Sequence, residues 1–183
     1  MMIHTKEDVL TLIQEDEWMM DALAVAEELQ LKDWCICAGF VRGKIWDTLH
    51  GFQRTELPDI DVVYYDATCL EKDKEKEYEH KLHRLFPGQP WSVKNQARMH
   101  AVNQDPPYDS TREALSRFPE TATALGVRLN QNKLELIAPF GVNDAVNLLV
   151  RPTPAYLHNL DRYHQRMKKK NWQKIWPNLT IQW

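Results

Sequence analysis

Long hydrophobic runs are missing from this chain of 183 residues, and none approaches the roughly 20 apolar residues that a membrane-spanning helix requires. Residues 1–8 also lack the basic start and the continuous apolar segment of a signal peptide. We therefore expect a cytoplasmic protein that has no membrane as its partner.

Cysteine is scarce, with three residues in the whole chain. Cys35 and Cys37 lie two positions apart in an apolar segment, and Cys69 lies further along. An odd number of cysteines does not fit a disulfide framework, and no cluster of cysteine and histidine supplies the ligands of a zinc site. We expect buried free thiols.

A strong charge of either sign is also missing, because 23 basic residues stand against 26 acidic ones and the net charge is −3. That balance argues against bulk affinity for nucleic acid, so we expect no DNA partner. A local basic surface is still compatible with this net charge. The composition, 43% hydrophobic and 27% charged, is ordinary for a globular protein. We predict a single domain over 1–183, with N-terminal helices in 1–32, a core in 33–150 and a C-terminal helix and tail in 151–183.

Segments with helical and with strand character alternate along the chain. Thr5 and Asp8 form the pattern of a capping box at the start of a first helix. Further helices are predicted over 17–31, 41–49, 68–85 and 155–170, and strands over 34–38, 60–65, 90–93, 126–130 and 133–137. This order predicts an α/β (α+β) fold in which helices flank a mixed central sheet.

Two carboxylates stand at the head of the predicted strand 60–65. Asp59 and Asp61 are two positions apart, so on a strand both side chains point to the same face. Neighbouring carboxylates repel each other unless a positive charge lies between them, and Mg²⁺ (or Mn²⁺) suits such a pair together with substrate phosphates. Exposed strand ends also produce this triplet, but the rest of the strand is strongly apolar, which favours a metal site.

The turn after the first strand has features of an anion site. Gly39 allows close approach of a ligand, and the helix that follows offers unpaired N–H groups, which Arg42 or Lys44 would reinforce. The alternative is a glycine needed for the turn and two basic residues on a solvated face. The acid pair that follows favours the anion site.

A polar cluster follows the predicted strand 90–93. It combines Lys94, Asn95, Gln96 and Arg98 within residues 94–100. Ligands of α/β proteins bind beyond the carboxyl ends of strands, so these side chains are candidates for contacts with a nucleobase, a sugar or phosphate. A polar strand-to-helix turn is an alternative of nearly equal weight.

Cations and tryptophans gather at the C-terminus. Residues 166–170 are rich in lysine and arginine, and Trp172, Trp176 and Trp183 follow. The cations would complement the dipole of the final helix, or contact RNA together with the aromatic rings. We favour tryptophans that anchor the tail on the core.

Taken together, these residues resemble the nucleotidyltransferase core of the DNA polymerase β superfamily: an apolar strand, Gly39, a helix, then Asp59-x-Asp61 on a second apolar strand. The chain is more closely similar to a bacterial family of predicted nucleotidyltransferases of unassigned substrate. That similarity spans nearly the whole chain and is carried by residues 38–42, 59–66, 91–100, 120–124 and 138–141.

The resemblance implies transfer of a nucleoside monophosphate from a nucleoside triphosphate to an acceptor, which would be a small molecule, a protein or RNA. Asp59 and Asp61 would be catalytic and would hold the metal ion. The nucleotide would be bound by Gly39, Arg42, Lys44, Lys94, Asn95, Gln96 and Arg98. Two other functions stay open, a non-catalytic nucleotide-binding module that regulates a partner, and an RNA-contacting protein that uses residues 168–170 with Trp172.

The chain departs from the superfamily pattern at two places. Phe40 follows Gly39, where the superfamily has a small residue. The superfamily also has a third carboxylate on the next core strand, where this chain has Ser92 and Lys94. The acids that are candidates for this role are Asp66, Glu120, Glu135 and Asp144.

Overall fold

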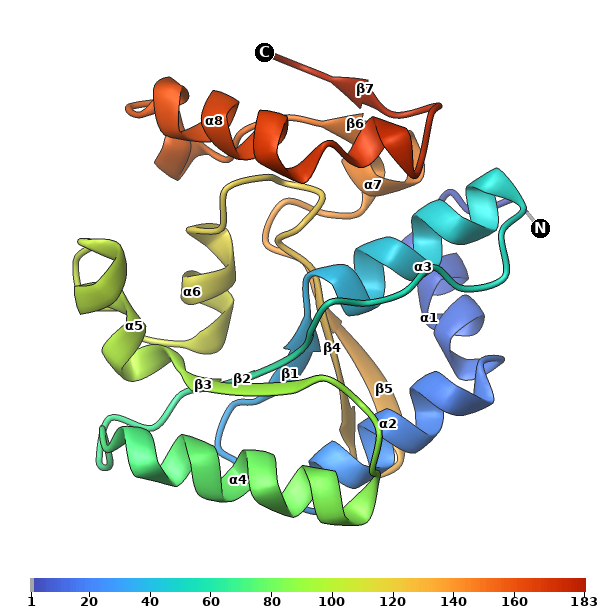
Figure 1. Cartoon of the computed structure of the whole chain (residues 1–183). Helices are drawn as coiled ribbons and strands as arrows, with labels where there is room; N and C mark the ends of the chain where they lie inside the picture. Colours follow the sequence, from blue (N-terminus) through green and yellow to red (C-terminus); the bar gives the residue numbers. More distant parts are fainter. Residues whose placement is uncertain (1) are drawn as a thin grey trace.

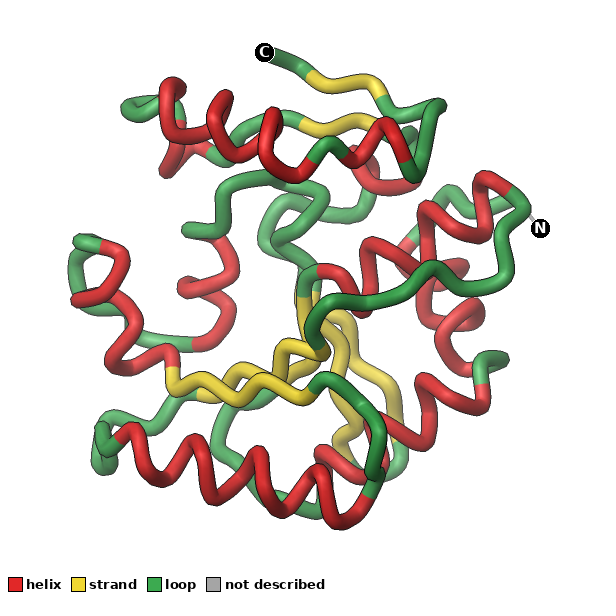
Figure 2. The backbone as a smooth tube through the Cα atoms, in the orientation of Figure 1, coloured by secondary structure: helices red, strands yellow, loops and turns green. Residues whose placement is uncertain are grey.

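The computed structural model describes residues 2–183, and its centre is a five-stranded sheet in the order β3-β2-β1-β4-β5 (Figure 1, Figure 2). The strands are β1 (Cys35–Cys37), β2 (Ile60–Tyr64), β3 (Trp91–Asn95), β4 (Gly126–Asn130) and β5 (Lys133–Ile137). β2 and β3 run parallel, whereas the other neighbouring pairs are antiparallel. The predicted mixed sheet flanked by helices is confirmed.

The helices are α1 (Lys6–Gln14), α2 (Glu17–Glu27), α3 (Gly39–His50), α4 (Lys72–Leu85), α5 (Gln96–Asn103), α6 (Thr111–Ser116), α7 (Asn143–Val146) and α8 (Leu160–Lys170). Figure 1 shows α2 and α4 along one side of the sheet and α5 and α6 on another, with α8 above them. α8 lies beside a small parallel pair, β6 (Leu149–Val150) and β7 (Thr180–Ile181). Within residues 2–183 no helix has both the length and the apolar character that crossing a membrane requires.

The predicted helix ends are confirmed at some places and corrected at others. The capping box of α1 forms, because the Thr5 side chain accepts from the Asp8 N–H and Asp8 bonds back to the Thr5 N–H. α2 ends at Glu27 rather than at residue 31, and Gln30 then takes a left-handed conformation with φ of 51°. α8 begins at Leu160 rather than at residue 155, since Pro154–Tyr156 forms a separate 3₁₀ turn, η1.

One face of the sheet is a continuous apolar belt. Ile36 of β1 lies opposite Val62 of β2 and Val127 of β4, and Val62 lies opposite Val93 of β3. All four side chains are fully buried. Removing this surface from water is the main stabilising contribution to the sheet, and it fixes the register of β2, on which the acid pair depends.

The other face of the sheet carries polar groups. Cys37 lies opposite Asp61, and Asp61 lies opposite Ser92. Leu115 of α6 packs over part of this face. The cysteines are free thiols, as predicted, although Cys69 is half-buried rather than buried.

Candidate active site

The chain turns sharply between β1 and α3 at Ala38, whose φ of 57° and ψ of −120° are strained for a residue with a Cβ. The sequence suggested that Gly39 makes this turn, which is wrong, because Gly39 is the first residue of α3 and does not have a positive φ. A Cβ at Gly39 would lie 3.5 Å from Nη2 of Arg42. No side chain caps α3, and Ala38 and Gly39 line a cavity of about 220 Å³.

The acid pair lines this same cavity, which we call the acid-pair cavity. Asp59 is exposed just before β2, and Asp61 is half-buried within the strand. Burial raises the pKa of Asp61 to about 6, and the charge of Asp59 acts in the same direction. The nearby cations oppose this rise, in the order Arg42, Lys170 and Lys94.

Three cations also line the acid-pair cavity: Arg42 from α3, and Arg166 and Lys170 from α8. The Arg42 side chain is buried, and burial lowers its pKa to about 10. Burial also lowers the pKa of Lys170. The cavity therefore places positive charge next to the two carboxylates. Asp59 and Lys170 are exposed, whereas Arg42 and Asp61 are less solvated, and charge interactions between such groups are stronger than in water.

A buried polar network supports Arg42. Its Nη1 donates to Oγ1 of Thr123 over 2.7 Å, and that hydroxyl donates to Oε2 of Glu120 over 2.6 Å. Glu120 is fully buried and forms an ion pair with Arg166. Nε of Arg42, in contrast, has no hydrogen-bond partner among residues 2–183. A buried donor without an acceptor is costly, so this nitrogen is a destabilising feature of an otherwise hydrogen-bonded network.

The C-terminal tail is anchored beside this network. The guanidinium of Arg42 lies 4.3 Å from the ring centroid of Trp172. Trp46 of α3 packs edge-on against Trp172 and Trp176, and the Trp176 indole N–H donates to Asp47 over 2.8 Å. The predicted anchoring role is confirmed for Trp172 and Trp176, whereas Trp183 is 60% exposed.

One stripe of α8 faces the site. Arg162, Arg166 and Lys170 recur at every fourth position, so their side chains lie on one face of the helix. The cations of residues 166–170 were predicted to complement the helix dipole or to contact RNA, and their direction toward the site was not predicted. The spacing of four was the available signal, but it does not tell which face of the helix turns inward.

A second cavity, of about 450 Å³, has Asp61 in its wall as well. We call it the larger cavity, and Cys37, Lys94, Gln96 and Arg162 also line it. A hydrogen bond with Cys35, burial and the charge of Asp61 raise the pKa of Cys37 well above its ordinary value. Its thiol is therefore protonated and is no nucleophile.

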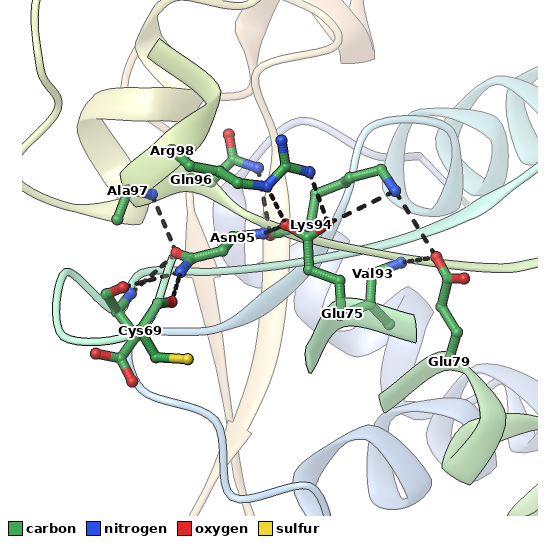
Figure 3. A network of polar contacts seen from close by, with 10 residues as sticks. Cys69, Glu75, Glu79, Val93, Lys94, Asn95, Gln96, Ala97 and Arg98 are labelled. Atoms are coloured by element: carbon green, nitrogen blue, oxygen red, sulfur yellow. Dashed lines mark hydrogen bonds and ion pairs between the residues drawn. The ribbon is translucent and has the colours of Figure 1, made fainter. Parts of the chain in front are cut away.

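The polar cluster after β3 divides in the structure (Figure 3). Asn95 caps α5 and donates to the carbonyl oxygens of Asp66 and Cys69, both within 2.9 Å. Arg98 donates two hydrogen bonds, of 2.8 and 2.6 Å, to the buried Glu75. Neither side chain lines either cavity. These two residues fit the alternative interpretation, a polar strand-to-helix turn.

The other predicted binding residues lie in three places: in the larger cavity, in the acid-pair cavity, or away from both. Lys94 and Gln96 line the larger cavity but not the acid-pair cavity, and Nζ of Lys94 lies 3.8 Å from Glu79 (Figure 3). Lys44 points away from both cavities, since its Nζ forms an ion pair of 2.8 Å with Asp16. Gly39 and Arg42 are the predicted phosphate-binding residues that the fold brings to the acid pair.

None of the candidate third carboxylates joins the acid pair. Each has another partner: Asp66 bonds Thr68 and Lys32, Glu120 pairs with Arg166, Glu135 pairs with Arg128, and Asp144 pairs with Arg151. Within residues 2–183 no group of three or more His, Cys, Asp or Glu is arranged to hold a metal ion. Glu56 also lines the acid-pair cavity, but it forms no such group with Asp59 and Asp61, so this pair supplies the hard oxygen ligands of the site.

The fold is that of the nucleotidyltransferases. A family model described as nucleotidyltransferase matches residues 24–181. The chain belongs to this family of nucleotidyltransferases. No curated protein matches the sequence.

Solved structures agree with this assignment. An NMR structure described as revealing a CCA-adding enzyme head domain is 37% identical, with 98% of this chain and 97% of that chain covered and a TM-score of 0.87. A CCA-adding enzyme with CTP is 15% identical at a TM-score of 0.58, covering 100% of this chain and 44% of that chain. The Thermotoga maritima CCA-adding enzyme complexed with tRNA is 18% identical at a TM-score of 0.59, covering 96% and 42%. The chain thus spans less than half of these two enzymes, whose likeness shows the fold alone.

Proposed function

We propose that this nucleotidyltransferase moves a nucleoside monophosphate from a nucleoside triphosphate to an acceptor hydroxyl, with Mg²⁺ (or Mn²⁺) as cofactor. The observation that supports this most directly is the acid-pair cavity. It combines Asp59 and Asp61 with the uncapped start of α3 and with three cations. Anionic phosphates fit the cations and the helix start, and a divalent cation fits the carboxylates.

The donor chemistry of the acid pair fits a magnesium ion. Asp59 and Asp61 supply oxygen ligands, and the triphosphate would supply more, as is usual for Mg²⁺ sites that lack a cage of protein ligands. When bound, the ion would neutralise charge that develops on the phosphates during in-line displacement. Asp59 and Asp61 are therefore the proposed catalytic and metal-binding residues.

The cations of the cavity would hold the phosphates. Arg42 lines the cavity, and a guanidinium is suited to donate hydrogen bonds to phosphate oxygens. Arg166 and Lys170 line the cavity from a different helix, α8. Gly39 leaves room for the phosphates at the helix start. Lys94 and Gln96 would lie on the acceptor side, and the structure gives Lys44, Asn95 and Arg98 other partners.

The related CCA-adding enzymes have been solved in complex with CTP, with ATP and with tRNA, which supports a nucleoside triphosphate as substrate here. We also propose that residues 1–183 act as one domain, since a single core cluster includes side chains from Ile3 to Leu179. A cytoplasmic location stays a prediction from the sequence.

The test is a panel of nucleoside triphosphates, with and without Mg²⁺, on the wild type and on Asp61→Asn. A ligand at 100 times its dissociation constant raises the free energy of unfolding by about 2.7 kcal/mol, which a thermal-shift assay detects. We expect at least one nucleotide to stabilise the wild type in a Mg²⁺-dependent way. Asp61→Asn should lose the Mg²⁺-dependent part, whereas Asp21→Asn, an exposed position on α2, should keep it.

Pyrophosphate release separates transfer from binding alone. A nucleotidyltransferase releases pyrophosphate when the acceptor is present, whereas a regulatory module binds the nucleotide without turnover. Ser92, and not a third carboxylate, lies opposite Asp61 on β3. This observation is the reason to test the second candidate function, a regulatory module that binds the nucleotide without turnover. If no nucleotide stabilises the wild type, both nucleotide functions are excluded.

A further inference from the structure

The larger cavity has the size of a small-molecule site and is separate from the acid-pair cavity except at Asp61. Its volume of about 450 Å³ falls within the range of roughly 300–1,000 Å³ that is usual for ligand pockets. Among residues 2–183, Asp61 is the one residue that lines both cavities. A ligand in the larger cavity would therefore meet a nucleotide in the acid-pair cavity at Asp61.

Two arginines in the wall of the larger cavity have no acidic partner. Arg117, just after α6, and Arg162 of α8 form no ion pair with any carboxylate among residues 2–183. Arg162 lies with its guanidinium 5.6 Å from the ring centroid of Tyr156. Asp105, an acid in the same wall, is already bonded by the Tyr108 hydroxyl. The two free guanidiniums are suited to a phosphate or carboxylate, which they can bind in a bidentate way.

The spacing of cations along α8 joins the two cavities. At a rise of 1.5 Å per residue, Arg162, Arg166 and Lys170 follow each other at about 6 Å and span about 12 Å. Arg162 serves the larger cavity, and Arg166 and Lys170 serve the acid-pair cavity. One helix face would thus hold two anionic ligands with Asp61 between them. A nucleoside is neutral and has no anionic group that Arg117 and Arg162 could bind.

We propose that the larger cavity binds the acceptor, and that the acceptor is a small molecule with a hydroxyl and an anionic group, most simply a phosphate monoester. This inference rests on the proposed function. Arg117 and Arg162 hold the anionic group, and the hydroxyl lies toward Asp61. The hydroxyl oxygen forms a bond to the α-phosphorus, the bond from that phosphorus to pyrophosphate breaks, and the hydroxyl proton passes to water. The chain's net charge of −3 and the limited volume favour a small acceptor over RNA.

The experiment is an NMR titration of the ¹⁵N-labelled full chain with Mg²⁺ present. The probes are α,β-methylene-ATP, ribose 5-phosphate, ribose, and an RNA dodecamer. The variants are Arg117→Ala/Arg162→Ala and, as a matched control that removes the same charge from an exposed part of α8, Lys168→Ala/Lys169→Ala. Arg162→Gln alone, at an exposed position, replaces the double variant if that variant does not fold.

We expect ribose 5-phosphate to shift amides around the larger cavity, such as those of Asn103, Phe118 and Asn159, and ribose to leave them unchanged. The arginine double variant should raise the dissociation constant of ribose 5-phosphate at least tenfold, and the lysine control should leave it within twofold. The nucleotide analogue should shift amides of the acid-pair cavity in all these proteins.

Other outcomes overturn the inference. The anion site is excluded if ribose 5-phosphate shifts no amide of the larger cavity, or if it binds the arginine variant as well as the wild type. A nucleotide analogue that occupies the larger cavity and competes with ribose 5-phosphate makes this cavity the nucleotide site instead. RNA that shifts the larger cavity while ribose 5-phosphate does not makes the acceptor a nucleic acid. The proposed function fails separately, if the analogue shifts neither cavity.

Discussion

Arg166 of α8 forms an ion pair with Glu120, a fully buried carboxylate that lies 46 positions earlier in the chain. Glu120 also accepts from Thr123, which in turn accepts from Arg42 of α3. This pair therefore ties the final helix to the start of α3, and it places one buried negative charge beside the two guanidiniums that lie near the acid pair.

Glu120→Ala should destabilise the fold by about 3–5 kcal/mol, because it leaves buried cations without their counter-charge. Urea unfolding measures the change. Glu77→Ala is the control, since Glu77 pairs with Lys74 at an exposed site, where an ion pair contributes about 0–1 kcal/mol. Equal effects of the two substitutions would show that the network around Glu120 is not a stabilising one.

Trp176→Ala should also cost about 3–5 kcal/mol, since it removes a buried ring from the contact with Trp46 and takes a donor from Asp47. Trp183→Ala removes the same side chain from a site that is 60% exposed, and should change the free energy of unfolding much less. Denaturant unfolding of both variants compares them. A small effect at Trp176 would mean that the tail does not depend on this anchor.

Asp61→Asn should stabilise the metal-free protein. Burial is the main reason why the pKa of Asp61 rises from 3.8 to about 6 on folding. At pH 7.5 the ionised carboxylate is therefore less favourable in the folded state than in the unfolded state, which lowers the free energy of unfolding. The free energy of unfolding in EDTA should rise by up to about 3 kcal/mol at pH 7.5, and the difference should vanish below about pH 3, where both states are protonated. A variant that is less stable in EDTA at pH 7.5 would show that the folded protein favours the charged form.

Asp16→Asn should destabilise the protein at pH 7 but not in acid. Burial acts to raise the pKa of Asp16, but Lys44, the Met19 N–H and Arg54 together lower it. The stabilisation is present above the pKa of the unfolded state, near 4, and is lost as pH falls through the lower pKa of the folded state. Thermal unfolding between pH 2 and 7 tests this, and Asp21→Asn, which removes an exposed carboxylate of α2, is the control.

Loss of Lys170 should affect nucleotide binding, whereas loss of Lys44 should affect stability. Lys170→Met removes a cation from the acid-pair cavity and should weaken Mg²⁺-dependent nucleotide binding by about tenfold. Lys44→Met removes one of the two cationic partners of Asp16 and should lower stability while the nucleotide affinity stays within twofold. Calorimetric titration together with thermal unfolding separates the two effects. Weaker nucleotide binding in Lys44→Met alone would place the triphosphate elsewhere.

Local regularities of the sequence predicted much of the fold. Strand alternation placed Asp59 and Asp61 on one face, and the structure has both in one cavity. The strands over 126–130 and 133–137 are those observed, and the capping box of α1 forms as predicted. Such features depend on neighbours within a few positions, which the sequence displays directly.

Only the tertiary structure decided which cations surround the acid pair. Lys44, close in sequence, turns to Asp16, whereas Arg166 and Lys170, more than 100 positions away, line the cavity. The direction of a side chain on a helix depends on how the helix is docked, and α8 is docked through the burial of Trp172 and Trp176 on Trp46. Contacts of this range follow from the packing of the whole core, so local periodicity carries no signal for them.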